Sequence, residues 1–352
     1  LYNSEMEKQQ LEAKTFSRRN FYNDDDSGKV FLFALILPIL LAILFTLISN
    51  LIVGVSGMES EQVSSSLAYT TILQVVSALA SIGLFLVYNK VNNISFSAVK
   101  LKFRMPYKNY IVAVMIGVVS LFGLQYFIGA VDDLLSLIGF PLEVSSPDMP
   151  ESLTNPKSLG VFFLSVFVTC LLPAISEELL FRGVILQGLR KRFGDIGSIF
   201  LSALMFALMH QNLQQLVYPF LLGSIMAWIV LRSGSLFSSM LVHFINNFLV
   251  ILFTYLSNVT SFSLELAGEW WFYLLALLLL GVTFAIIYLI DRFVYKHKSE
   301  ENLESESQDQ KGENGGAKKQ SQDNSPQKTS KYIYISLCVS ILLFLFVNII
   351  NF

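Results

Sequence analysis

Charged residues are scarce in this chain, and their scarcity excludes an ordinary soluble domain. Lys, Arg, Asp and Glu make up 14% of the 352 residues, whereas roughly a quarter is usual in soluble domains. Hydrophobic residues reach 54%, and the mean hydropathy is +0.59. The net charge of −2 and the lack of a basic block give no indication of nucleic-acid binding. A membrane protein is the class that remains.

Cysteine is also rare, with Cys170 and Cys338 as the only two. Both lie inside apolar runs, and their spacing fits neither a disulfide framework nor a metal site. We expect no cleavable signal peptide, because the first apolar run begins near Val30 and is too long for a signal-peptide core. We interpret that run as the first membrane-spanning helix.

Apolar runs of about 20 residues recur, which is the length that one helix needs to cross a hydrocarbon core of roughly 30 Å. We therefore predict an all-α, polytopic transmembrane helical bundle with about eight spans and a C-terminal ninth. The predicted spans are 30–54, 67–88, 110–131, 158–190, 196–213, 216–232, 235–257, 270–291 and 332–352. The fourth span is longer than one crossing needs. In an alternative interpretation, its last part is an amphipathic extension that does not cross the membrane.

Lysine and arginine alternate between the connections, which indicates orientation because these residues favour the cytoplasmic side. They are frequent before the first span, between spans two and three, and after span eight. By contrast, the connection 55–66 has none and 132–157 has only Lys157. We predict a multi-pass protein of the cell membrane with a cytoplasmic N-terminus. The Phe-, Ile- and Lys-rich composition suggests a bacterial source.

Polar segments suggest five parts in the chain. We predict a cytoplasmic tail at 1–29, N-terminal spans at 30–109, and at 110–291 a core that holds the polar residues considered next. Residues 292–331 are rich in Ser, Gln, Glu, Asn, Lys and Gly, so we predict a disordered cytoplasmic linker. The transmembrane helix 332–352 follows it.

Ionisable and amide side chains gather inside three predicted spans, where such groups are costly and usually face a cavity or a partner. They are Glu177, Glu178, Arg182, His210, His243, Asn246 and Asn247. At 1.5 Å per residue, the acids, the histidines and Asn247 lie about 12–20 Å from the span ends that we place at 190, 197 and 235. Their shared depth predicts one buried polar site.

Helix geometry distinguishes the two glutamates. Glu178 and Arg182 are four residues apart on one helix face, in the favoured order for an ion pair. Glu177 is turned about 100° away and has no such local partner. Pro173 lacks the N–H that would bond Thr169, so we expect a bend beside this lone carboxylate.

Each feature also has a structural explanation. A Glu–Arg pair at this spacing often only stabilises a helix, a lone histidine often only packs, and a His–Asn pair can join two helices by hydrogen bonds. These explanations leave the common depth of the two membrane histidines and the unpaired Glu177 unexplained. We therefore favour a functional site.

A carboxylate and an imidazole can hold one water, take its proton and deliver hydroxide to a carbonyl carbon. A second histidine and an amide on a neighbouring helix can donate hydrogen bonds to the oxyanion that forms. This chemistry needs no serine or cysteine nucleophile. Cys170 lies two turns before Glu177, but no base lies beside it.

Three motifs together resemble those of the CPBP family of intramembrane proteases, the CAAX-protease and bacteriocin-processing group, also called Abi. This family includes the type II CAAX prenyl endopeptidases. The resemblance covers roughly residues 110–260, and every signature position is matched. The motifs are Glu177-Glu178-x-x-x-Arg182, Phe206-x-x-x-His210 and His243-x-x-x-Asn247.

The resemblance implies a role for each residue. Glu177 corresponds to the catalytic glutamate, His210 to the histidine that helps to activate water, and His243 with Asn247 to the pair that stabilises the oxyanion. The choice of Asn247 rests on the family, because Asn246 also lies within reach of His243. The residues that we expect to support the site are Glu178, Arg182, Phe206 and Asn246.

We expect no cofactor. One glutamate and two histidines, Glu177, His210 and His243, also suit a zinc ion with an open position. The sequence leaves that alternative open, although the lack of an HExxH motif favours a site without metal. As partners we expect a membrane protein or peptide as substrate, the lipid bilayer, a membrane partner for the C-terminal helix, and no nucleic acid.

The sequence thus predicts a CAAX-type intramembrane endopeptidase that uses water activated by Glu and His. The alternative is a non-catalytic membrane scaffold, or a bacteriocin-immunity or envelope-regulating protein that acts through partners. Transport is disfavoured, because no paired broken helices occur in two halves of the chain.

Overall fold

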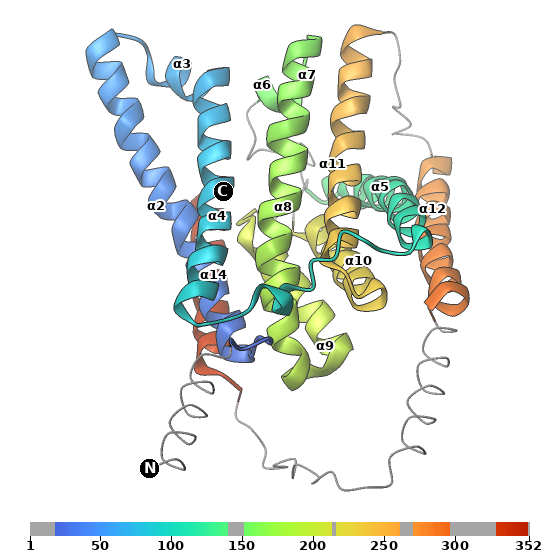
Figure 1. Cartoon of the computed structure of the whole chain (residues 1–352). Coiled ribbons are helices and arrows are strands. Elements are labelled where there is room, and N and C mark those ends of the chain that lie inside the picture. Colours follow the sequence, from blue (N-terminus) through green and yellow to red (C-terminus); the bar gives the residue numbers. More distant parts are fainter. Residues whose placement is uncertain (1–17, 140–150, 213–215, 261–269, 296–328, 351–352) are drawn as a thin grey trace, which may run out of the picture.

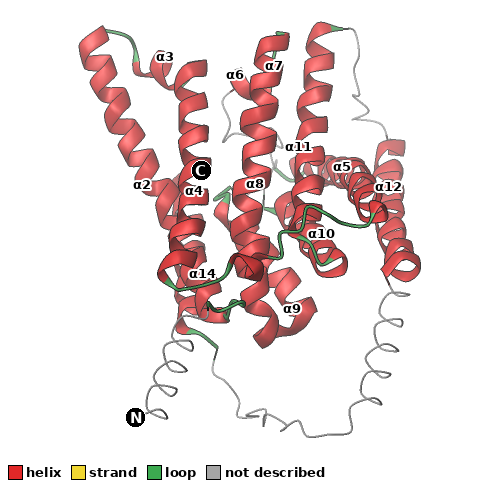
Figure 2. Ribbon diagram, in the orientation of Figure 1, coloured by secondary structure: helices red, strands yellow, loops and turns green. Residues whose placement is uncertain are grey.

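The computed structural model describes residues 18–139, 151–212, 216–260, 270–295 and 329–350. These residues form helices joined by short loops, as Figure 2 shows. The α-helices are α2 (Asp24–Ser56), α3 (Ser60–Ser64), α4 (Leu67–Val91), α5 (Tyr107–Ser136), α6 (Glu151–Thr154), α7 (Leu159–Ser165), α8 (Leu172–Glu178), α9 (Leu186–Met209), α10 (Val217–Ser233), α11 (Leu236–Val259), α12 (Trp270–Ile290) and α14 (Lys331–Ile350). A 3-10 turn, η1 (Phe96–Val99), and three π-helical segments, η2 (Val166–Leu171), η3 (Leu179–Ile185) and η4 (Asp291–Tyr295), complete the set.

Within the described residues, seven helical segments are long and apolar enough to cross a membrane. The prediction of an all-α, polytopic bundle is therefore confirmed, and the protein is a multi-pass membrane protein. Two predicted spans, 158–190 and 196–213, fall in the single run Leu159–Met209. That run turns at Gly194, whose φ of 67° and ψ of −178° leave the helical region and favour glycine.

The predicted span 216–232 corresponds to α10, which has 17 residues. At 1.5 Å per residue it is about 25 Å long, which is shorter than a hydrocarbon core of roughly 30 Å. Together with the second half of α9 it forms a short helical hairpin (Figure 1). The described part of its turn, residues 210–212, is not helical. Inside a bilayer, such backbone occurs where protein or a water-filled cavity surrounds it.

The run α7–η2–α8–η3 stands in the middle of the bundle (Figure 1). Segment α8 contacts α4 on one side and α11 on the other. Next to α11 lies α5, which in turn contacts α12, and on the far side α2 contacts α4, α9 and α14. The predicted site residues on α8 and η3, which are Glu177, Glu178 and Arg182, are therefore surrounded by helices from both halves of the chain.

The central run is not a regular α-helix, because η2 and η3 flank α8 as π-helical turns. Pro173 lies in the first turn of α8, directly after η2. Proline supplies no N–H to the preceding turn, so the wider π-helical turn replaces the α-helical bond there. The predicted irregularity at Pro173 thus takes the form of a π-helical segment. Such segments are frequent at functional sites.

A second polar cluster ties the start of α2 to the end of α4. Asp26, 3% exposed, pairs with Arg19 at 2.9 Å and accepts a hydrogen bond of 2.8 Å from the Tyr88 hydroxyl. The Tyr22 hydroxyl donates to Asn89 at 2.8 Å, and burial raises the pKa of Tyr22, so this hydroxyl keeps its proton. The cluster fixes the entry of the chain into the membrane.

Helix α2 begins at Asp24, ahead of the predicted span at 30, because Asn23 caps it together with Asp26. The predicted tail 1–29 and linker 292–331 lie for the most part outside the described residues.

We expect Asp26→Ala to destabilise the folded protein by about 3 kcal/mol, because it leaves Arg19 and Tyr88 without their buried partner. Unfolding in detergent micelles would measure the change. Asp195→Ala is the control: its carboxylate is 59% exposed and pairs with Arg190, so the loss should stay below about 1 kcal/mol. Equal losses for the two variants would contradict this account.

Candidate active site

The predicted site residues come from three elements. Glu177 and Glu178 lie at the end of α8, and Arg182 follows on η3. Phe206 and His210 lie at the end of α9. The third group, His243, Asn246 and Asn247, lies on α11, which packs directly against α8.

The centre of the site is the ion pair of Glu178 and Arg182. The guanidinium Nη1 donates to Glu178 Oε1 at 2.7 Å, and both side chains are 0% exposed. Nη2 donates to the backbone oxygen of Gly223 at 3.2 Å, and the guanidinium carbon lies 4.3 Å from the centre of the Phe206 ring. A Cβ at position 223 would lie 3.1 Å from Nη2 and would crowd the guanidinium. The predicted pair is confirmed, and it joins η3 to α9 and α10.

His243 lies against both glutamates. Its Nδ1 is 3.1 Å from Glu178 Oε1, and its Nε2 is 4.0 Å from Glu177 Oε2. Because a carboxylate accepts, Nδ1 carries the proton and Nε2 is the nitrogen that faces Glu177. A distance of 4.0 Å is too long for a direct hydrogen bond, but it suits a water that contacts both groups.

The two glutamates differ in exposure as well as in partners. The Glu177 side chain is 24% exposed, whereas that of Glu178 is fully buried. As expected from helix geometry, Arg182 pairs with Glu178 rather than with Glu177. Glu177 is the carboxylate that an incoming water or substrate can reach.

His210 ends α9 rather than lying within a span. Its backbone N–H donates to the Ala207 oxygen at 3.2 Å, and its ring Nδ1 lies 3.0 Å from the Phe206 oxygen. The Phe206 ring lies between the two histidines, 5.0 Å from the His210 ring and 6.2 Å from the His243 ring. Within the described residues, no hydrogen bond or ion pair joins His210 to Glu177 or His243.

Asn247 and Asn246 have different partners. Asn247 Nδ2 donates at 3.1 Å to the Thr169 oxygen, the carbonyl for which Pro173 has no N–H. Asn246 is 1% exposed and accepts a 2.8 Å bond from the Tyr218 hydroxyl. Its Nδ2 has no hydrogen-bond partner among the described residues, so it is a free donor beside His243.

Sequence reasoning missed Tyr218, which orients Asn246 from α10. A tyrosine in an apolar run carries no signal of that role, because its partner is 28 residues away on another helix. The sequence identified Thr169 only as the residue whose carbonyl lacks a bond from Pro173. It did not predict that Asn247 on α11 bonds this carbonyl.

A zinc site requires at least three ligands around one point. Among the described residues, no group of three His, Cys, Asp or Glu side chains is arranged to hold a metal ion. The residues as placed therefore do not assemble a three-ligand zinc site, and the chemistry below is derived from side chains alone.

We expect Arg182→Ala to lower the free energy of unfolding by about 3–5 kcal/mol, because Glu178 loses its charged partner in the interior and keeps only the bond from His243. Adding Glu178→Ala should restore part of that loss, since the two residues act as one unit. Unfolding in detergent would measure both. Arg232→Ala, whose side chain is 49% exposed and pairs with Asp291, is the control. Strictly additive losses would contradict the assigned pairing.

Residues 159–249 match the family model described as "Rce1-like: Type II CAAX prenyl endopeptidase Rce1-like". Comparisons with curated proteins and with solved structures gave no match. The matched residues run from α7 into α11 and contain all the predicted site residues. The expected resemblance to the CAAX-type, or CPBP, intramembrane proteases is thus confirmed for this segment of the chain.

Proposed function

We propose that the protein is an intramembrane endopeptidase that hydrolyses a peptide bond of a membrane-associated protein or peptide. The family match supports a peptidase. The observation that carries the proposal is the position of His243, with one ring nitrogen on Glu178 and the other 4.0 Å from the accessible Glu177. A base, a histidine and room for a water thus meet at one point.

In the first step Glu177 acts as the general base. A water held between Glu177 Oε2 and His243 Nε2 gives its proton to the carboxylate as its oxygen attacks the scissile carbonyl carbon. Collapse of the tetrahedral intermediate breaks the C–N bond, and the same proton passes to the leaving amine. Water supplies every atom that the hydrolysis adds.

His243 and an amide stabilise the oxyanion. The bond to Glu178 orients the ring, and Nε2 donates to the oxyanion when it carries a proton as well as Nδ1. Asn247 uses one amide hydrogen on Thr169 and keeps a second. The free Nδ2 of Asn246 is the other candidate donor.

His210 assists from the other side of the Phe206 ring. Its Nδ1 is held by the Phe206 carbonyl, so Nε2 is the nitrogen left for proton transfer. We assign it the helper role that the family resemblance implies, acting through water or bound substrate.

We also propose that the N-terminus lies in the cytoplasm of a bacterial cell and that the protein resides in its cell membrane. The alternation of lysine and arginine between connections supports this orientation.

A non-catalytic scaffold is the second candidate. One observation favours it: Glu178, Arg182 and His243 bond one another in the interior, as a purely structural network would. In that case Glu177 would be dispensable.

We expect Glu177→Gln to reduce proteolysis at least about 100-fold, because an amide cannot take a proton from water. The measurement compares peptide termini in membranes of cells that carry the native protein or the variant at matched levels. Glu61→Gln is the control, because Glu61 is an exposed carboxylate outside the site. Termini that persist unchanged in Glu177→Gln would refute the protease and leave the scaffold.

We expect the Glu177-dependent termini to survive treatment of the membranes with a strong chelator, because the described residues do not gather three metal ligands. Incubation with 1,10-phenanthroline before termini are collected would check this. Loss of cleavage that added Zn²⁺ restores would show that the metal-free mechanism is wrong.

A further inference from the structure

Helix α14 lies outside the matched family segment, yet it packs tightly on α2 (Figure 1). A Cβ at Gly28 would lie 2.5 Å from the backbone nitrogen of Ile333 and 2.5 Å from the carbonyl carbon of Tyr332. The two backbones are therefore in direct contact, and only glycine permits this approach. A helix that merely shared the membrane with α2 would not require it.

Polar contacts fasten the start of α14. The backbone N–H of Ser330 donates to Asp24 at 2.9 Å, and the Ser330 hydroxyl donates to Asp25. Arg192 Nε donates to the Thr329 hydroxyl at 2.9 Å. Acidic and basic groups of α2 and α9 thus fix where α14 enters the bundle.

The other end of α14 reaches the turn that carries His210. Asn348 Nδ2 donates at 3.2 Å to the backbone oxygen of Gln211, which has a positive φ of 51°. Ile333, near the start of α14, contacts Gly28 near the start of α2, and Val347 near the end of α14 lines one cavity with Ile39 and Ala42 of α2. The two helices therefore run in the same direction (Figure 1).

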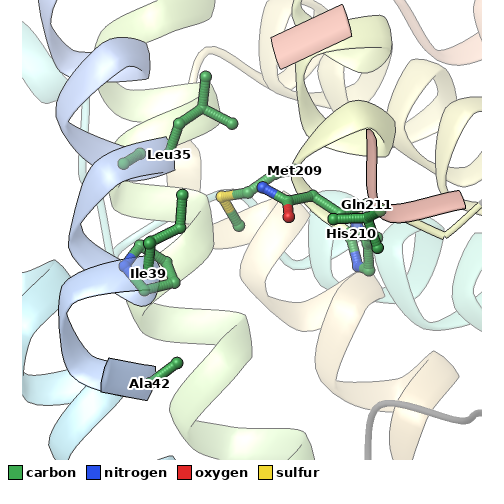
Figure 3. A pocket seen from close by; sticks show the side chains of 9 residues that line it. Leu35, Ile39, Ala42, Met209, His210 and Gln211 are labelled. Carbon is green, nitrogen blue, oxygen red and sulfur yellow. The ribbon is translucent and has the colours of Figure 1, made fainter. Parts of the chain in front are cut away.

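A cavity of ≈ 280 Å³ lies between α2, the end of α14 and this turn. Figure 3 shows the α2 side chains on one side and Met209, His210 and Gln211 on the other. The α14 residue that lines it is Val347. The lining is apolar except for His210 and Gln211, which come from the irregular backbone after α9. The lining residues are Ala34, Leu35, Pro38, Ile39, Ala42, Met209, His210, Gln211 and Val347.

We propose that the groove between α2 and the turn after α9 is the docking site for the membrane-spanning helix of a substrate, and that α14 is its resident occupant. This rests on the proposed function, because it supplies the route by which a substrate reaches His210. The partner that fits is a single apolar helix with small residues flanked by large ones on one face, like the buried face of α14 formed by Ile333, Ser336, Ser340 and Phe344.

Covalent connection makes α14 a strong competitor. A segment of the same chain has a high effective concentration at the groove, so a separate helix binds only when α14 leaves. Weakening the contact at Gly28 should therefore open the groove, and strengthening it should close the groove.

The experiment places a photo-crosslinking amino acid at Ile39, which lines the cavity from α2. The probe is a synthetic membrane-spanning Leu/Ala helix with Lys at its ends, added with lipid to the full chain. In the native background the crosslink should join Ile39 to α14. Gly28→Ala should raise the crosslink to the probe about tenfold, which corresponds to about 1.4 kcal/mol.

Gly54→Ala is the matched control, since it makes the same change on the same helix and a Cβ there meets nothing within 4 Å. Its crosslinks should equal those of the native chain. If Gly28→Ala keeps the intramolecular crosslink and captures no more probe than Gly54→Ala, the proposal is overturned.

A reversible lock provides the second variant. In a Cys338→Ser background, Gly28→Cys with Tyr332→Cys would place two thiols where Cβ atoms approach to 2.8 Å, close enough for a disulfide after a small shift. Oxidation should abolish probe capture, and reductant should restore it. Capture that is unaffected by oxidation would also overturn the proposal.

The same variants separate this inference from the proposed function. If Gly28→Ala raises probe capture but no termini depend on Glu177, the docking groove stands and the protease function is refuted. If termini depend on Glu177 but are equal in Gly28→Ala and Gly54→Ala, the protease function stands and the docking groove is refuted.

Discussion

The buried ion pair of Glu178 and Arg182 is the constraint on which the rest of the site depends. Two charges without solvent exposure need close geometry and hydrogen-bonding partners to offset the loss of water. Arg182 has Glu178, the Gly223 carbonyl and the face of Phe206 as partners, while its Nε and Glu178 Oε2 have no hydrogen-bond partner among the described residues. Those contacts join η3 to α9 and α10, and Glu178 extends the network to His243 on α11. The pair thereby sets the distance between the three elements that carry the site.

This arrangement also explains why two adjacent glutamates can have different tasks. Glu178 bonds Arg182 and Nδ1 of His243. Glu177 lies on another face of the helix, where its side chain is 24% exposed and 4.0 Å from Nε2 of His243. His243 thus transmits the position of the buried pair to the accessible carboxylate. Loss of Arg182 would change the position of His243 relative to Glu177, although Arg182 makes no bond with Glu177. This is typical of residues that orient a catalytic group.

The sequence alone was sufficient for features that depend on spacing along one helix. The Glu178–Arg182 pair follows from a separation of four residues, and the irregularity at Pro173 follows from its missing N–H. Contacts between helices were beyond its reach, because periodicity gives a face and a depth but no neighbour. The bond from Asn247 to Thr169 and the seating of α14 against Gly28 are of that kind. The end of the span was predicted at 213, whereas α9 ends at Met209, where the polar residues His210, Gln211 and Asn212 begin.

The two interpretations of His210, as a helix cap and as a catalytic helper, are compatible. The ring bonds the Phe206 carbonyl, which the backbone N–H of His210 leaves free by turning to Ala207. A cap of this kind settles which nitrogen holds the proton and aims the other one, as hydrogen bonds do for functional histidines generally. It also requires the helix to end inside the bilayer, where exposed backbone is tolerated only beside protein or a cavity. The chain meets that requirement with α2 and α14, since Asn348 bonds the next carbonyl of the turn. The helix that blocks access to His210 is therefore also one that stabilises the turn presenting it, so a substrate helix that displaces α14 has to replace that hydrogen bond.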